Sequence, residues 1–516
     1  MHDLTLSHDP SPAREAGSGP YERLVLRNVT VIDGTGAAAQ GPVDLIIEGN
    51  RIHSVHLVGS PMVMAMTQGR ARPQADDRTR EIDLRGHFVL PGLFDCHAHI
   101  GGAFKAPSLQ YIYNLLLGHG VTSIREPGCF VNGLDFTQSE VLRSDANEIV
   151  APRIAPYVGF GQGHTTPIEN VHAAVDWLEG AVQRGAQGVK FLGYRDDIYA
   201  AAIRWLGERS LGSMTHHSRP VAGSFDALVS ARYGLSSVEH WYGLPEAMFT
   251  DRRVQHFPLS FNWEDEQERY HQAGRAWLEC APPGSSRWND VIDELVGLGT
   301  ALDPTFAIYN GTRDAERVQR SFWYRDYAAP QAWEFWKPSR QSHGSAFYDW
   351  GTEREVSWRK VYHRWMDFVM DFHCRGGRVT VGSDAGSFYK RYGFGVIEEL
   401  EMLREAGMHP LEVIRAATLS SAELLGVDAD RGSIAPGKLA DLIILEENPL
   451  ENLKVLYGHG RLLLNEDDEL VRRGGVKLTM KDGILYDARE LLADVRTEVL
   501  AERERRGITQ LDPLIY

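Results

Sequence analysis

The sequence predicts an α/β protein: a (β/α)8 TIM barrel with a smaller composite β-sandwich domain built from both chain ends. Three observations predict this fold. From residue 88 to about 426, short apolar segments alternate with helical segments, which is typical of a parallel sheet covered by helices. The regions on either side carry short strands of alternating polarity instead. The length of 516 residues allows two or three domains, and a barrel counts as one.

The composition narrows the class of protein. Hydrophobic residues make up 43% of the chain and charged residues 24%, which is the balance of a soluble globular protein. The 54 Lys and Arg against 70 Asp and Glu give a formal charge of −16, which disfavours nucleic acid as a partner. No apolar run is long enough to span a membrane, and the N-terminus lacks the regions of a secretory signal. We therefore expect a cytoplasmic protein that acts on a small molecule.

The N-terminal part of the β-sandwich is expected at residues 21–88. Residues 1–20 contain no apolar run, and we expect them to form a disordered extension. The segments RLVLRNVTVIDG and VDLIIEGNRIHSV are short, rich in Val, Ile and Leu, and bounded by Gly or Asn, as strands are. A surface insertion at 58–80 separates them from the next strand, EIDLRGHFVL.

The barrel is expected over residues 89–428. Helical segments near 107–119, 170–184 and 197–208 each precede an apolar segment: GVTSIREPG, GVKFLGY and SMTHHS, respectively. An insertion at 311–370 is rich in aromatic residues, namely Phe322, Trp323, Tyr324, Trp333, Trp336, Phe347, Tyr348, Trp350 and Trp358. Two interpretations of this insertion stay open. The aromatic side chains either bury themselves in helical packing or form a lid over the active site.

The C-terminal region returns to short strands. Residues 429–490 contain GSIAPGKLADLIIL and VKLTMKDGILYD, which we expect to complete the β-sandwich, because chain termini often lie close together. Residues 491–516 are expected to form a helix and tail. The helix carries apolar residues at 491, 495 and 499, so its apolar face packs on the body or in an oligomer contact.

Two of the 20 histidines stand at the end of the first expected barrel strand. His97 and His99, in VLPGLFDCHAHIGG, project to the same side of a strand, and Asp95 shares that side. Two imidazoles in this arrangement form a bidentate metal site. Taken alone, such a pair is equally consistent with two structural histidines.

Four further residues at strand ends extend this candidate site. Lys190 ends GVKF, where a buried ammonium is costly unless it is paired or neutralised. Carboxylation would turn this lysine into a carbamate able to bridge two cations. His216, His240 and Asp384 end the strands SLGSMTHH, LSSVEH and RVTVGSD. Because all strand ends of a βα barrel meet at one face, we expect these side chains to converge. His217 is the alternative to His216, since only one of two neighbours on a strand points inward.

These motifs resemble the amidohydrolase superfamily, especially its imidazolonepropionase-like and prolidase-like members. The resemblance covers most of the chain and is carried by VLPGLFDCHAHIGG, GVTSIREPG, GAQGVKF, SSVEH, TVGSDAG, AATLSSAELLG and GSIAPGKLADLIIL. It implies the (β/α)8 barrel and the composite β-sandwich. It also implies a divalent metal site, with two zinc ions bridged by carboxylated Lys190.

The same resemblance assigns roles to the other residues. His97 and His99 are implied to bind the more buried metal, and His216 and His240 the second metal. Asp384 is similar to the aspartate that binds metal and shuttles the proton. His164, in GFGQGHTTP, resembles a loop histidine that contacts substrate or an oxyanion. A solvent-exposed loop histidine is the alternative for this position.

The chemistry expected from such a site is hydrolysis of a C–N bond in an amide, a dipeptide or a cyclic amide. A metal lowers the pKa of its bound water, and two metals can hold a bridging hydroxide and polarise the carbonyl. Asp384 would take the proton and pass it to the leaving amine. Two alternatives stay open. One is a single-metal C=N hydrolase or deaminase without lysine carboxylation. The other is a non-catalytic barrel that acts as a binding or assembly module. A homo-oligomer is expected.

Overall fold

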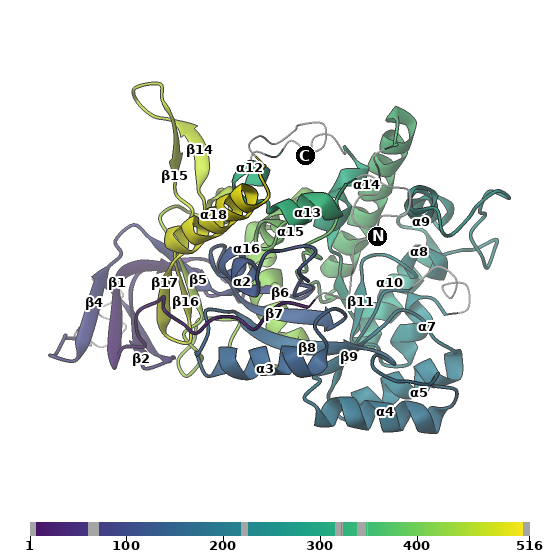
Figure 1. Ribbon diagram of the computed structural model, residues 1–516, viewed down its shortest axis with the longest axis horizontal. Helices are drawn as coiled ribbons and strands as arrows, with labels where there is room; N and C mark the ends of the chain where they lie inside the picture. The colour runs from purple at the N-terminus through teal and green to yellow at the C-terminus, as the bar shows by residue number, and fades with distance from the viewer. Residues whose placement is uncertain are drawn as a thin grey trace.

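Two large sheets organise the molecule (Figure 1). The computed structural model describes residues 7–59, 72–217, 225–314, 321, 323–337, 347 and 349–508. A seven-stranded parallel sheet is covered by helices, and an eight-stranded sheet lies at the other end of the molecule. The predicted mixed α/β class and the separate sheet domain are therefore confirmed.

The parallel sheet follows the chain in order, with β6 at one edge and β12 at the other. Its strands are buried, as their apolar sequences require when helices cover the sheet. They are β6 (Leu93–Asp95), β7 (Val121–Gly128), β8 (Arg153–Gly159), β9 (Gly188–Phe191), β10 (Gly212–Thr215), β11 (Ser237–Glu239) and β12 (Ala301–Asp303).

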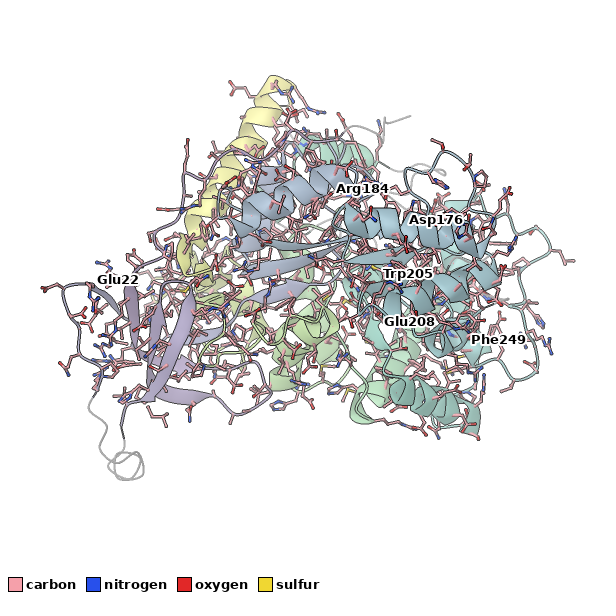
Figure 2. All side chains as sticks on the ribbon, turned by 90° about the horizontal axis from the view of Figure 1, so that it is seen from below. Glu22, Asp176, Arg184, Trp205, Glu208 and Phe249 are labelled. Carbon is pink, nitrogen blue, oxygen red and sulfur yellow. The ribbon has the colours of Figure 1, made fainter. Side chains whose placement is uncertain are left out.

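Helices connect these strands and form the outer layer, where Figure 2 shows Asp176 and Arg184 at α4. Three of them, α2, α4 and α5, match the helices that the sequence predicts near 107–119, 170–184 and 197–208. The connecting helices are α2 (Leu109–Leu117), α3 (Leu134–Asp145), α4 (Val171–Gln183), α5 (Asp196–Gly207), α7 (Ala227–Arg232), α8 (Leu244–Ala247), α9 (Glu266–Glu279) and α10 (Ser286–Leu298).

The segment 378–384 lies between the two edge strands of the parallel sheet. Leu302 of β12 forms a parallel bridge with Val379. On the other side, the Cys96 N–H donates to Val381 O at 2.7 Å. In the described residues this segment forms only that one bridge and is not a regular strand. The structure therefore confirms a curled parallel sheet, but not the complete eight-stranded barrel that the sequence predicts.

The second sheet joins both ends of the chain. Its order is β17-β16-β13-β5-β1-β2-β3, with β4 paired to β1. Strand β5 connects the two parts, because it pairs with β1 on one side and β13 on the other. Hydrogen bonds join all eight strands in one continuous sheet. The strands are β1 (Arg23–Val31), β2 (Gln40–Glu48), β3 (Arg51–Leu57), β4 (Thr79–Asp83), β5 (Phe88–Pro91), β13 (Leu442–Leu445), β16 (Val476–Lys481) and β17 (Ile484–Asp487). The exact domain boundaries stay a prediction.

Residues 7–20 lie along the body, which differs from the disordered extension that the sequence predicts. Ser18 forms a β-bridge with Leu485 of β17. The His8 N–H donates to Asn132 Oδ1 at 3.2 Å. Residues far away in the sequence thus form hydrogen bonds with the backbone of this segment. Composition alone does not reveal such partners.

The aromatic insertion forms helices whose large side chains are buried. Trp336 is 1% exposed and Trp358 is fully buried. No described residue from 313 to 370 lines the central cavity described below. Helical packing is thus favoured over a lid for the described part of this stretch. Phe322 and Tyr348 lie outside the described residues. The helices are α12 (Trp323–Tyr327), α13 (Pro330–Phe335) and α14 (Thr352–Cys374).

The C-terminal region ends in helix α18 (Ala488–Arg505), which packs against α2 and β16 through Leu492, Val495 and Val499. A hairpin of β14 (Arg461–Leu464) and β15 (Leu470–Arg473) projects from the body (Figure 1). Among the described helices, none has the length and apolar character needed to cross a membrane. The remaining elements are η1 (Phe306–Thr312), α15 (Phe394–Glu405), α16 (Pro410–Arg415), η2 (Ala416–Ser420), α17 (Ser421–Leu424) and η3 (Leu453–Leu456).

Candidate metal centre

A cavity of about 400 Å³ opens where the parallel strands end. Its floor carries His99, Lys190, His216, His240 and Asp384, all of which the sequence predicts as metal ligands. His97 lies directly beneath this floor and is fully buried. The structure therefore brings all six predicted ligands to one place, as the strand-end argument requires. Their roles as ligands stay a prediction.

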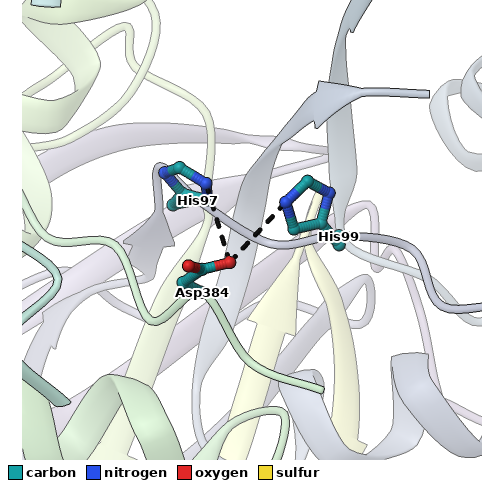
Figure 3. Close-up of side chains that lie close together, drawn as sticks. All are labelled: His97, His99 and Asp384. Carbon is teal, nitrogen blue, oxygen red and sulfur yellow. Dashed lines mark ion pairs between the residues drawn. The ribbon is translucent and has the colours of Figure 1, made fainter. Parts of the chain in front are cut away.

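Two histidines and one carboxylate form the centre of this cluster (Figure 3). Asp384 Oδ1 lies 3.7 Å from His97 Nε2 and 3.6 Å from His99 Nε2. These distances are too long for good hydrogen bonds. Two ligand atoms bound at about 2.1 Å to one tetrahedral ion lie about 3.4 Å apart, so the spacing suits a shared divalent cation.

Lys190 and His240 lie next to this cluster of two histidines and one carboxylate. Lys190 Nζ lies 3.0 Å from His97 Nε2, and His240 Nε2 lies 3.8 Å from Asp384 Oδ2. His240 and Asp384 both have positive φ, at 63° and 48°. Non-glycine residues rarely adopt this conformation, and such strain is often found at functional sites.

The structure places His216 rather than His217 at the cavity. The His216 ring centroid lies 4.8 Å from that of His240 and 4.4 Å from that of Tyr242. His217 is fully buried, and its Nε2 lies 2.7 Å from Ser230 Oγ on α7. Strand alternation separates the two neighbours in this way, because their side chains leave the backbone on opposite sides.

His164 lies apart from the other predicted site residues. It is exposed and lines a separate surface pocket that also includes Asp176 and Arg184. The structure therefore gives no support to the catalytic role that the sequence predicts for it. The Gly-rich loop after β8 directs this side chain away from the cavity, and the sequence carries no sign of that direction.

Several groups that line the cavity are not among the residues predicted from the sequence. Lys105 contributes a half-buried ammonium, whose Nζ lies 3.4 Å from Ser387 Oγ. In the described part of the chain no carboxylate forms an ion pair with it. Glu126 Oε1 lies 3.5 Å from His99 Nδ1. Lys105 lies in the loop after β6, where periodicity gives no signal. Glu126 lies within β7, so the buried charge in GVTSIREPG could have drawn attention to it.

Aromatic side chains form the upper wall of the cavity. Tyr270 of α9 and Tyr309 of η1 stand with Tyr242 and Phe388, and Phe130 closes the opposite side. Their ring centroids are 5.2 Å apart for Tyr270 and Phe388, which is within ordinary aromatic contact. The cavity thus combines an ionisable floor with an apolar, aromatic wall.

Burial dominates the electrostatics of the floor. Burial and the Lys190 ammonium hold the pKa of His97 well below its ordinary value. Burial also lowers the pKa of Lys190, against the attraction of the Asp384 carboxylate. Neutral imidazoles are the form that a metal binds, so these directions suit a metal centre.

The sequence matches the amidohydrolase family over residues 367–485. It is also 22% identical to an adenine deaminase of Paracoccus denitrificans over an alignment of 455 residues that covers 83% of this chain and 60% of that protein. An adenine deaminase of Methanoculleus marisnigri is 36% identical over an alignment of 92 residues that covers 16% of this chain and 17% of that protein. The family match over this segment and the relatives both point to the amidohydrolase superfamily. The match spans less than two thirds of the length of these curated relatives.

Solved structures share the fold of this chain. The bottromycin amidohydrolase has a TM-score of 0.62 and 18% identity, and the match covers 96% of this chain and 92% of that one. A Xaa-Pro dipeptidase with bound methionine has a TM-score of 0.59 and 18% identity, with coverage of 90% and 100%. At this identity the similarity shows the fold alone.

Proposed function

We propose that the protein is a metal-dependent hydrolase that cleaves a C–N bond in an amide, a dipeptide or a cyclic amide. The observation that carries this proposal is the convergence of His97, His99 and Asp384 at the floor of a cavity, with N···O distances of 3.6–3.7 Å. An imidazole–carboxylate donor set of this kind is typical of zinc and related divalent ions. The amidohydrolase family match supports the same reaction class.

The residues that would hold the metal are the six at the strand ends. His97, His99 and Asp384 lie close enough together to fit one ion. His216 and His240, whose ring centroids are 4.8 Å apart, are proposed to hold a second ion on the cavity side. Lys190 Nζ lies 3.0 Å from His97 Nε2, and a carbamate on this lysine is proposed to bind both ions. A bound divalent cation would lower the pKa of a water molecule and polarise a carbonyl group.

Asp384 is the residue proposed to hold and move the proton. Its side chain is 19% exposed, so it faces both the buried histidines and the cavity. A carboxylate in this position can accept a proton from water on one side and deliver it to a leaving amine on the other. Its backbone N–H donates to His97 O at 2.8 Å, which fixes its position relative to the histidines.

The cavity favours a substrate that carries an anionic group beside an apolar or aromatic group. Lys105 supplies an ammonium, and Tyr242, Tyr270, Tyr309 and Phe388 supply the aromatic wall. N-acyl amino acids and dipeptides combine these features with a scissile C–N bond. We propose them as the first substrate class to test.

The test is a hydrolysis screen of dipeptides and N-acyl amino acids on zinc-loaded protein, with Asp384→Asn as the control. We expect hydrolysis by the wild-type protein and a loss of about 10²- to 10⁴-fold in kcat for the variant, because the proton carrier is removed. Metal content is measured in parallel. Less than one divalent ion per chain, after supply of zinc and bicarbonate, would contradict the proposal.

A deaminase is the second candidate, because the curated relatives that match the chain are named adenine deaminases. Such a reaction replaces an exocyclic amine by oxygen and also breaks a C–N bond. Release of ammonia from aminopurines, without cleavage of any amide in the screen, would favour this candidate. The homo-oligomeric state and the cytoplasmic location that the sequence predicts stay predictions.

A further inference from the structure

A fully buried cluster of charges lies behind the candidate metal centre. Arg125 of β7, Glu239 of β11 and Asp303 of β12 each have fully buried side chains. Arg125 NH2 donates to the two Glu239 oxygens at 2.9 and 3.0 Å and to Asp303 Oδ2 at 3.1 Å. Burying charges costs free energy, and even a paired buried cluster adds little net stability. Packing alone therefore does not explain this cluster.

Glu239 connects this cluster to a proposed metal ligand. Its Oε2 lies 2.6 Å from His97 Nδ1, and a carboxylate can only accept there, so Nδ1–H donates. The other nitrogen of the ring, Nε2, faces Lys190 and Asp384. In the neutral imidazole, a proton fixed on Nδ1 leaves the Nε2 lone pair directed at the metal site.

Arg125 holds both sides of this arrangement. Its Nε–H donates to the carbonyl oxygen of Cys96, the residue before His97, at 2.5 Å. Its NH1 donates to Ser237 Oγ at 3.0 Å, and the Ser237 hydroxyl in turn donates to Glu239 Oε1 at 2.6 Å. One guanidinium therefore positions the backbone that carries the ligand and the carboxylate that orients it.

We propose that Arg125 and Glu239 are positioning residues that fix the tautomer and orientation of His97 for metal binding. This inference rests on the proposed metal site. His97, Glu239 and Asp303 also lie close enough together to suggest a second cation site. The guanidinium of Arg125 contacts Glu239 and Asp303 there, so its positive charge takes the place of a bound metal ion.

The test measures zinc affinity, by competition with a chelator, in the variants Glu239→Ala and Glu239→Gln. We expect Glu239→Ala to lower the affinity about 10- to 100-fold, as loss of the partner of a ligating histidine does. Glu239→Gln keeps an oxygen that can accept from Nδ1–H, so it is expected to recover part of this loss. Purely structural damage would not follow this order.

Glu399→Gln is the matched control. Glu399 is also fully buried, but its Oε2 accepts from the Ala307 N–H, and no contact joins it to His97 in the described residues. This variant is expected to keep wild-type zinc affinity. Circular dichroism of the metal-free proteins checks that each variant is folded.

Two outcomes would overturn the inference. The first is wild-type zinc affinity in folded Glu239→Ala. If that variant does not fold, Ser237→Ala, which removes one hydrogen bond to the carboxylate, takes its place. Wild-type affinity in both Ser237→Ala and Glu239→Gln is then the second outcome that would overturn it. A wild-type protein that binds no zinc would instead defeat the proposed function, so the two failures are distinguishable.

Discussion

At the scale of single residues, the two neighbours that directly follow β10 have opposite environments. His216 faces the cavity, whereas His217 is buried against Ser230. We expect His216→Ala to lose about one metal ion per chain while its melting temperature changes little. His217→Ala should keep its metal but lose stability, because a buried hydrogen-bonded ring is removed. Metal analysis and thermal melting of both variants test this prediction, and the reverse pattern would assign the ligand to His217.

The two lysines at the cavity are expected to have different roles: Lys190 in metal binding and Lys105 in substrate binding. Lys190 lies 3.0 Å from His97 Nε2, whereas Lys105 lies beside Ser387 at the cavity wall. Lys190→Ala should therefore reduce metal content and abolish activity. Lys105→Ala should keep the metal and raise KM for substrates with a carboxylate by about tenfold or more, since a charged hydrogen bond is lost. Full metal content and activity in Lys190→Ala would favour a single-metal enzyme.

At the scale of elements, the segment 378–384 depends on a glycine. A Cβ on Gly382 would lie 2.6 Å from both carboxylate oxygens of Asp303 and 2.7 Å from His97 Cβ. The segment can thus pass between β12 and β6 only because this position has no side chain. This segment stands where a regular eighth barrel strand is missing, and Asp384 at its end lies at the candidate site.

Gly382→Ala is therefore expected to destabilise the protein by about 1–3 kcal/mol through overpacking, and to lower its metal content. The matched control is Gly180→Ala in α4, where a Cβ would meet nothing within 4 Å. That variant should gain about 0.5–1 kcal/mol, because alanine favours the helix. Urea unfolding of both variants gives the comparison. An unchanged free energy of unfolding in Gly382→Ala would show that the segment can move aside.

At the scale of the whole molecule, buried histidines make stability depend on pH. Burial lowers the pKa of His119 to about 4, and the ring is fully buried against Phe394. The unfolded chain binds the proton near pH 6.5, so it gains protons before the folded protein does. Stability from this residue is therefore complete above about pH 6.5 and is lost as the pH falls to about 4. The loss is on the order of 3 kcal/mol.

We expect the free energy of unfolding, measured in urea from pH 7 to pH 5, to fall less steeply in His119→Phe than in the wild-type protein. His172→Phe is the control, since this histidine on α4 is 89% exposed. It should keep the wild-type slope. The prediction concerns the slope, so it holds even where the variant loses the hydrogen bond between His119 Nδ1 and Leu115 O at 2.7 Å. Equal slopes in all three proteins would contradict it.

Much of the candidate site could be predicted because strand geometry is simple. Successive side chains alternate, and parallel strands all end at one face. His97, His99, Lys190, His240 and Asp384 therefore converge as the sequence predicts. Lys105 and His164 lie in loops, where no period relates sequence to direction. Lys105 is therefore not predicted from the sequence, and His164, predicted at the central cavity, lines a different pocket.

The sequence by itself determined the α/β class, the strand-end positions of the candidate metal ligands and the resemblance to the amidohydrolase superfamily. These depend on local patterns: period, strand-end position and short motifs. Only the tertiary structure decided which of His216 and His217 reaches the cavity, how Arg125 and Glu239 support His97, and where residues 7–20 lie. These depend on contacts between residues far apart in the chain, and such contacts exist only once the strands have packed.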